Sequence, residues 1–110
     1  MNQINLNDMR NNADEAVTLL RTMAHEDRLI LLCQLTGHEM CVSELEQQLD
    51  IRQPSLSQQL GVLRREGLVL TRREGKHIYY RVKQGPALEL LNALHSLYCG
   101  KQQTAKGDNQ

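Results

Sequence analysis

The stretch PSLSQQLGVLRREGLVLTRREGKHIYYRV, residues 54–82, decides the fold of this chain. Its first part predicts a helix, because three leucines recur at helical spacing and line one face. These are Leu56, Leu60 and Leu63. Proline is tolerated in the first turn of a helix and glycine is common just past its end, so we expect the helix to run from Pro54 to Gly67.

The second part of the stretch predicts a β-hairpin. Residues 68–73 and 77–82 are rich in β-branched, aromatic or alternating side chains, as strands are. Glu74-Gly75-Lys76 separates them and supplies the glycine typical of a tight hairpin turn. Strand alternation points either Tyr79 or Tyr80 inward, so we expect at least one of these rings in the core.

Three helices are predicted before this stretch and one after it. The spacing of apolar residues predicts helices over 8–23, 27–35 and 87–99. Ser43 and Glu46 have the spacing of a capping box, which predicts a short helix over 44–49. Two short helices joined by a tight turn and followed by a basic hairpin are typical of a winged helix-turn-helix. The predicted fold class is therefore mainly α with a small β-hairpin.

Length and composition predict one domain over residues 1–100 and a frayed tail over 101–110. The chain has 110 residues, of which 40% are hydrophobic, with no Phe or Trp and three Tyr, so the core must be aliphatic. A subunit of this size buries a modest fraction of its surface, so we expect a partner subunit to complete the core, making the protein homodimeric.

The sequence also indicates the cellular compartment of the protein. The longest apolar run, from Leu29 to Cys33, is far shorter than the ~20 residues that cross a bilayer, and the first residues have no apolar signal region. We therefore expect a cytoplasmic protein with no membrane partner. Its three cysteines would be kept reduced there, so any thiol role is redox or metal chemistry.

Charge is divided unevenly along the chain. Residues 1–51 hold three basic and nine acidic side chains, a net charge of −6, whereas residues 52–83 hold eight basic and two acidic side chains, a net charge of +6. A concentrated basic segment is the electrostatic feature of a surface that faces phosphates. Because this segment coincides with the predicted helix and hairpin, it favours binding of double-stranded DNA.

The candidate DNA-binding residues fall into two groups. Glutamine can pair with adenine and serine can adapt to either base edge, so the helix offers short polar readers for the major groove. Arginine, lysine and histidine in or near the hairpin would contact phosphates or enter the minor groove. The readers are Gln53, Ser55, Ser57, Gln58 and Gln59, and the basic group is Arg64, Arg65, Arg72, Arg73, Lys76 and His77.

Residues 18–82 resemble the ArsR/SmtB family of bacterial transcriptional repressors. The matching segments are MAHEDRLILL, VSELEQQLDIRQPSLSQQLGVLRREGLV and REGKHIYYRV. The resemblance implies a homodimer held by the first and last helices, which binds an inverted repeat in promoter DNA. Two residues depart from the family pattern: Glu26 stands where proline is common, and Arg52 stands where a small capping residue is common.

The cysteines bear on what such a repressor would sense. Local sequence favours an inert, buried Cys33, because its neighbours are leucines. The segments RLILLC and HSLYC, however, resemble the BigR/SqrR/HlyU subgroup of the family. That resemblance implies that Cys33 and Cys99 form a dithiol that reacts with persulfides, polysulfides or oxidants and lowers DNA affinity when bridged, so that sulfide and persulfide detoxification genes are expressed.

Three other interpretations stay open. A metal- or metalloid-responsive repressor could use Cys41 with Cys33, His38 or a residue across the dimer, although the Cys-x-Cys pair typical of such sensors is incomplete here. A thiol enzyme is disfavoured by the absence of a Cys-x-x-Cys motif. A DNA-packing protein without an effector is disfavoured by the zero net charge. We expect no metal, no cofactor and no catalytic residue.

Overall fold

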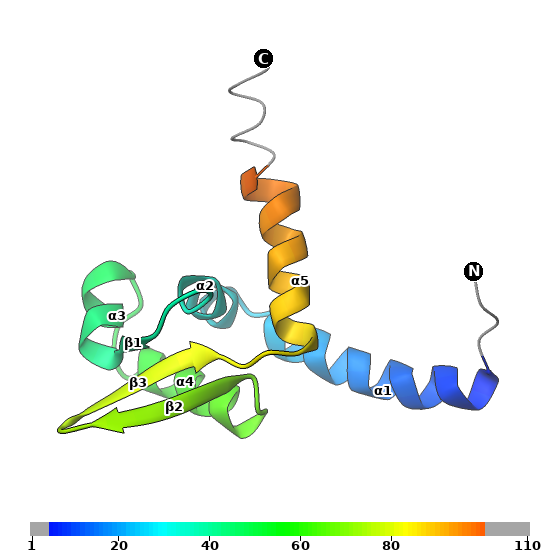
Figure 1. The fold of residues 1–110 in the computed structure, drawn as a ribbon, viewed down its shortest axis with the longest axis horizontal. Coiled ribbons are helices and arrows are strands. Elements are labelled where there is room, and N and C mark those ends of the chain that lie inside the picture. Colours follow the sequence, from blue (N-terminus) through cyan, green and yellow to red (C-terminus); the bar gives the residue numbers. More distant parts are fainter. Residues whose placement is uncertain (1–4, 101–110) are drawn as a thin grey trace, which may run out of the picture.

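The computed structural model describes residues 5–100, with side chains through residue 98. The elements, in chain order, are α1 (Leu6–Met23), α2 (Glu26–Gln34), β1 (Met40–Cys41), α3 (Val42–Gln48), α4 (Ser55–Arg65), β2 (Val69–Glu74), β3 (His77–Val82), α5 (Pro86–His95) and the π-helical turn η1 (Ser96–Gly100). The predicted mainly α fold with a winged helix-turn-helix is confirmed (Figure 1). The predicted tail over 101–110 lies outside the described residues.

The wing is a three-stranded antiparallel sheet in the order β1-β3-β2. Strands β2 and β3 pair in register from Val69 opposite Val82 to Glu74 opposite His77. Strand β1 adds two pairs on the other edge of β3, with Met40 opposite Tyr80 and Cys41 opposite Tyr79. The sequence did not predict β1, because a two-residue strand has no periodicity of its own and is defined by its pairing with a distant segment.

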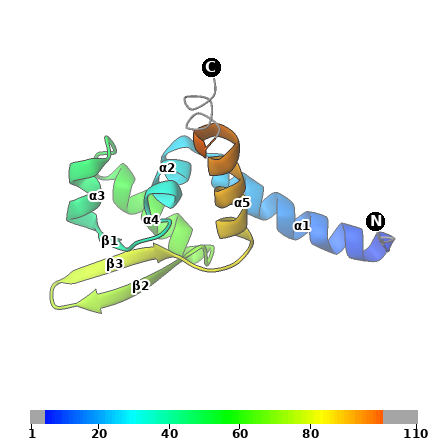
Figure 2. The ribbon, with the colours of Figure 1, turned by 45° about the horizontal axis from the view of Figure 1, so that its top comes forward.

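An aliphatic core joins the helices beneath the wing. Leu56, Leu60 and Leu63 of α4 are each no more than 2% exposed, as their spacing predicted. They pack in one buried cluster with Leu31 and Leu32 of α2 and with residues of α3, β2, β3 and α5. Tyr80 packs against this cluster, which confirms that one ring of the tyrosine pair is directed inward. This core fixes α4 between α2, α3 and the wing (Figure 2).

The start of α3 differs from the sequence prediction. The helix begins at Val42, and the Glu44 carboxylate accepts a hydrogen bond from the Cys41 backbone N–H at 3.0 Å. The capping box predicted from Ser43 and Glu46 is therefore wrong by two residues. The physical reason is β1, which ends at Cys41 and turns the chain into the helix earlier than the side-chain pattern alone indicates.

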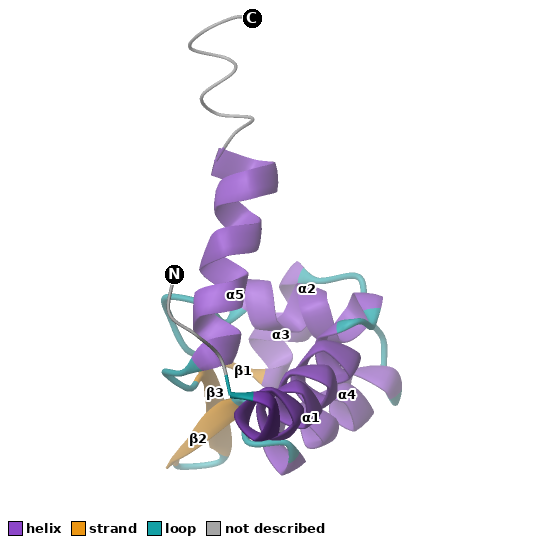
Figure 3. Cartoon of the chain, turned by 90° about the vertical axis from the view of Figure 1, so that its right-hand side faces the viewer, coloured by secondary structure: helices purple, strands orange, loops and turns teal. Residues whose placement is uncertain are grey.

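Helices α1 and α5 project from the rest of the subunit (Figures 1 and 3). The radius of gyration is 16.4 Å, against ~13 Å for a compact domain of this length. Along α1 the side chains of Leu6, Met9, Val17 and Leu20 are between 45% and 72% exposed. An apolar face is thus left uncovered in the single subunit. None of the helices in the described part of the chain is both long enough and apolar enough to cross a membrane.

Candidate functional site

The outer face of α4 presents few of the predicted readers freely. Ser57 and Gln58 are exposed on the side opposite the buried leucines. Gln53, before the helix, is also exposed, but its Oε1 accepts a hydrogen bond from the Ser57 backbone N–H at 3.0 Å and so caps the first turn of α4. Of these three side chains, Gln58 is the longest one that points outward without an internal hydrogen bond among the described residues.

The other two predicted readers face α2 instead of solvent. Ser55 donates from Oγ to the Asp27 carboxylate at 3.3 Å. Gln59 accepts from Arg28 Nη1 at 3.0 Å, and Arg28 also donates from Nε to the Thr22 carbonyl at 2.7 Å. Both side chains are half-buried. They connect α4, the predicted reading helix, to α2, a role that helical spacing alone did not indicate.

In the wing, the structure pairs Arg72 with carboxylates of its own subunit. Its Nε donates to Glu39 at 2.9 Å, its Nη2 forms an ion pair with the same carboxylate, and its Nη1 donates to Glu74 at 2.7 Å. The guanidinium also lies over the Tyr79 ring, 4.9 Å from its centroid. Arg72 thereby ties β2 to the residue that precedes β1.

These contacts shift the protonation equilibria of the group. The hydrogen bond from Arg72 holds the pKa of Glu39 below its ordinary value, and Glu39 and Glu74 raise the pKa of Arg72 further above its ordinary value. Partial desolvation is the main cause that raises the pKa of Tyr79. Glu39 was not among the predicted site residues, because it lies 33 positions before Arg72 and no local pattern joins the two.

The remaining basic candidates are exposed. Arg73 lies in β2 and donates from Nε to the Gly75 carbonyl at 3.4 Å, a weak contact at the hairpin turn. The others stand at the end of α4 and at the tip of the wing: Arg64, Arg65, Lys76 and His77. The structure thus brings the end of α4 and the wing tip to the surface as two separate basic clusters.

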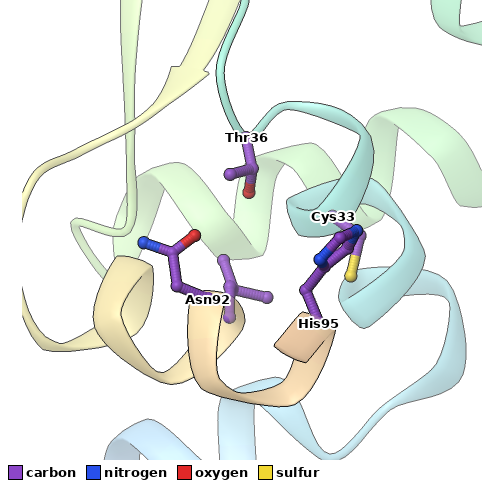
Figure 4. A pocket seen from close by; sticks show the side chains of 5 residues that line it. Cys33, Thr36, Asn92 and His95 are labelled. Atoms are coloured by element: carbon purple, nitrogen blue, oxygen red, sulfur yellow. The ribbon is translucent and has the colours of Figure 1, made fainter. Parts of the chain in front are cut away.

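A second candidate site lies between α2 and α5. Cys33 is exposed, so the interpretation of this residue as a buried core thiol is wrong. Position 33 is on the side of α2 that faces away from the leucine core, and its thiol opens into a pocket of about 250 Å³. The pocket is lined by Cys33, Thr36, Leu91, Asn92 and His95 (Figure 4).

Cys99 comes later in the chain than the α5 residues that line this pocket. Its backbone belongs to η1, which continues α5 directly, but its side chain lies outside the described side chains. The pairing of Cys33 with Cys99 therefore stays a prediction. The structure shows Cys33 opposite α5, the helix that leads into Cys99.

Cys41 has a different environment. It is 5% exposed in β1, and its Sγ lies 3.3 Å from Ser43 Oγ. Within the part of the chain that the structure describes, no three His, Cys, Asp or Glu side chains gather as a metal site would require.

Comparison with known proteins places the chain among bacterial regulators. A family profile described as "Bacterial regulatory protein, arsR family" matches residues 25–71. The biofilm growth-associated repressor of Xylella fastidiosa is 49% identical over 98 residues, which cover 89% of this chain and 86% of the relative.

Two solved structures share the fold over nearly their whole length. The transcriptional regulator HlyU from Vibrio vulnificus CMCP6 has a TM-score of 0.81 and 47% identity, covering 87% of this chain and 100% of that one. The transcriptional repressor BigR from Xylella fastidiosa has a TM-score of 0.78 and 49% identity, covering 87% and 98%.

Proposed function

Because this chain belongs to the ArsR family of bacterial regulatory proteins, we propose that it is a repressor whose operator affinity is set by the redox state of Cys33 and Cys99. It is a transcriptional regulator like the BigR and HlyU proteins that it resembles. The proposed DNA target is an inverted repeat in a promoter, bound by a homodimer in the cytoplasm. The reaction with its effector is stoichiometric, so no enzymatic turnover is expected.

The observation that carries this proposal is the exposed Cys33 thiol in the pocket between α2 and α5. A sensing thiol must be reached by its reagent, and an inert core thiol need not be. Cys33 is exposed although Leu31 and Leu32 before it in α2, and Leu35 just after the helix, are buried. Since α5 runs on into η1, a bridge from Cys33 to Cys99 would join two separate helices.

The chemistry balances with a hydropersulfide as both sulfur donor and oxidant. Two cysteine thiols and one RSSH can give a disulfide, RSH and H₂S; two thiols and three RSSH can give a four-sulfur bridge, three RSH and H₂S. A direct disulfide needs Cα atoms ~4.4–6.8 Å apart, and each inserted sulfur extends that reach by ~2 Å. A longer separation between the two cysteines would therefore favour the polysulfide bridge over the plain disulfide.

The described contacts offer a route from the thiols to the reading helix. Cys33 is in the last turn of α2, and Asp27 and Arg28 are in its first turn. These two residues hold Ser55 and Gln59 of α4. A bridge that pulls α2 toward the end of α5 would thus act on the orientation of α4, and a coupling of ~1–3 kcal/mol would weaken DNA binding about 5- to 150-fold.

Intact mass spectrometry and DNA mobility shifts test the proposal together. After treatment with glutathione persulfide, we expect the wild-type mass to rise by two sulfurs less two hydrogens and the protein to release promoter DNA. Cys33→Ser and Cys99→Ser should bind DNA before and after treatment, whereas Cys41→Ser should respond like the wild type. Peroxide, used separately, should give at most a plain disulfide.

Two results would overturn the proposal. One is release of DNA by both Cys33→Ser and Cys99→Ser after persulfide treatment. The other is evidence for a metal-responsive repressor, either loss of the response in Cys41→Ser alone or release of DNA on stoichiometric binding of zinc or arsenite.

A further inference from the structure

The pocket beside Cys33 contains an ionisable side chain that the dithiol chemistry does not yet use. His95 of α5 lines the pocket together with Cys33, and Figure 4 shows the imidazole ring and the thiol on the same side of it. Asn92, one helical turn earlier on α5, lines the same pocket. Within residues 5–98, neither the His95 nor the Asn92 side chain is engaged in a hydrogen bond.

We propose that this pocket is where the sulfur reagent meets Cys33, and that His95 exchanges the proton with the reacting sulfurs. The inference rests on the proposed function and adds a residue to it. The imidazole takes the proton from Cys33 Sγ, and the thiolate attacks the terminal sulfur of R–S–SH. The S–S bond of the reagent breaks, its electron pair leaves on RS⁻, and the His95 imidazolium returns the proton to form RSH. The products are Cys33–S–SH and RSH, with atoms and electrons balanced.

Histidine suits this role because its proton exchange falls in the physiological pH range and because a cationic imidazole next to a thiol favours the thiolate. The described lining of the pocket contains no carboxylate that would oppose this effect. The charged side chains of α2, namely Glu26, Asp27 and Arg28, are in its first turn, and Glu89 lies near the start of α5. Arg28 is engaged with Gln59 and the Thr22 carbonyl, and Asp27 with Ser55.

The size and polarity of the pocket indicate the class of reagent. Its volume of about 250 Å³ is below the ~300–1,000 Å³ typical of sites for drug-sized ligands. Asn92 and His95 can both donate hydrogen bonds, whereas the Thr36 hydroxyl already donates to the Leu32 carbonyl at 2.8 Å. A pocket with such donors fits a small anionic species such as inorganic hydropolysulfide.

The test uses the full chain with Cys41→Ser and Cys99→Ser, which leaves Cys33 as its single thiol. Two rates are measured. One is alkylation of Cys33 by monobromobimane between pH 5 and 9, and the other is sulfur transfer to Cys33 from inorganic hydropolysulfide, monitored by intact mass spectrometry. In this background His95→Gln should slow both reactions about tenfold at pH 7 and move the midpoint of the alkylation profile to higher pH. His38→Gln replaces an exposed histidine that does not line the pocket and should change neither reaction.

Each outcome decides the inference. Rates and midpoint that stay within twofold of the His38→Gln control, with unchanged circular dichroism, would overturn it. A shifted midpoint without slower sulfur transfer would also overturn it, because His95 would then act only as a nearby charge. The proposed function is judged separately, by whether the persulfide-treated wild type releases DNA. A normal release with an unaffected His95→Gln rate refutes the inference alone.

Discussion

Arg72 illustrates how a residue in a basic segment can be engaged within its own subunit. The sequence suggests a phosphate contact, but the side chain is held by Glu39 and Glu74 and lies over Tyr79. Three partners on one exposed guanidinium fix β2 relative to the residue that precedes β1, rather than leaving a cation free for DNA. The net charge of residues 52–83 therefore overstates how many basic side chains of this segment are free to contact phosphates.

Removing Glu39 should make this charge more available, because Glu74 is then its one remaining acidic partner among the described residues. We expect Glu39→Gln to bind operator DNA more tightly and to make the slope of log K against log salt more negative by ~0.9, the value for one additional phosphate contact. Fluorescence anisotropy across a salt series measures both quantities. Glu89→Gln removes the same charge from an exposed position on α5 and should leave the slope unchanged. Weaker binding by Glu39→Gln would instead mean that bracing the wing matters more than freeing Arg72.

The same pair predicts a pH dependence of stability. Arg72 lowers the pKa of Glu39 in the folded protein below its ordinary value of 4.5. A carboxyl with a lowered folded pKa stabilises the fold above its unfolded pKa and loses that contribution as the pH falls through the folded value. The Tm of the wild type should thus exceed that of Glu39→Gln at neutral pH, and the difference should close as the pH drops below 4.5. Paired thermal scans at low salt, where exposed ion pairs are least screened, give the measurement.

At the scale of elements, α4 has two faces besides its buried one: an outer face that is exposed and a side that is bonded to α2. Gln58 points outward, whereas Gln59, its neighbour, is bonded to Arg28 of α2. Gln58→Ala should lower operator affinity by ~1–3 kcal/mol, the range for one side chain that pairs with a base, with stability within ~0.5 kcal/mol of the wild type. Gln59→Ala is the matched variant: urea unfolding should show it to be the more destabilised, since it leaves a half-buried guanidinium with one partner fewer. Equal losses of affinity in the two variants would contradict this division of the helix.

Local patterns predicted those elements that local patterns define. The leucine spacing of α4 and the strand–glycine–strand order of the wing placed the elements within one or two residues of their observed bounds. Strand β1, the Cys41–Glu44 cap and the Arg72–Glu39 pair were not predicted, because each depends on β1 lying against β3. The exposure of Cys33 was misjudged for a related reason: its leucine neighbours are buried by α4, but position 33 itself faces the pocket beside α5.

At the scale of the whole molecule, the single subunit leaves apolar surface that its own core does not use. A groove of about 460 Å³ runs between α1 and α5 and is lined by residues such as Ala16, Leu19, Leu68 and Leu90. A second one, beside it, involves Leu20, Leu29 and Leu94. Helix α5 borders both these grooves and the Cys33 pocket. If the proposed dimer buries the grooves, a shift of α5 at the pocket would also change the subunit interface. This links the proposed thiol switch to the spacing of two reading helices in a dimer.

The proposed dimer can be broken at α1. Leu20 is 53% exposed on the apolar face of this helix, and a two-fold interface contains each substituted position twice. Leu20→Glu should therefore shift the mass found by light scattering from two subunits toward one and weaken binding to an inverted repeat, because the two half-sites would no longer be bound together. Asn11→Glu introduces the same side chain at an exposed position on the opposite side of α1 and should remain dimeric. A Leu20→Glu protein that keeps the dimer mass would show that the subunits associate through another surface, and the coupling between thiols and reading helices would then have to act within one subunit.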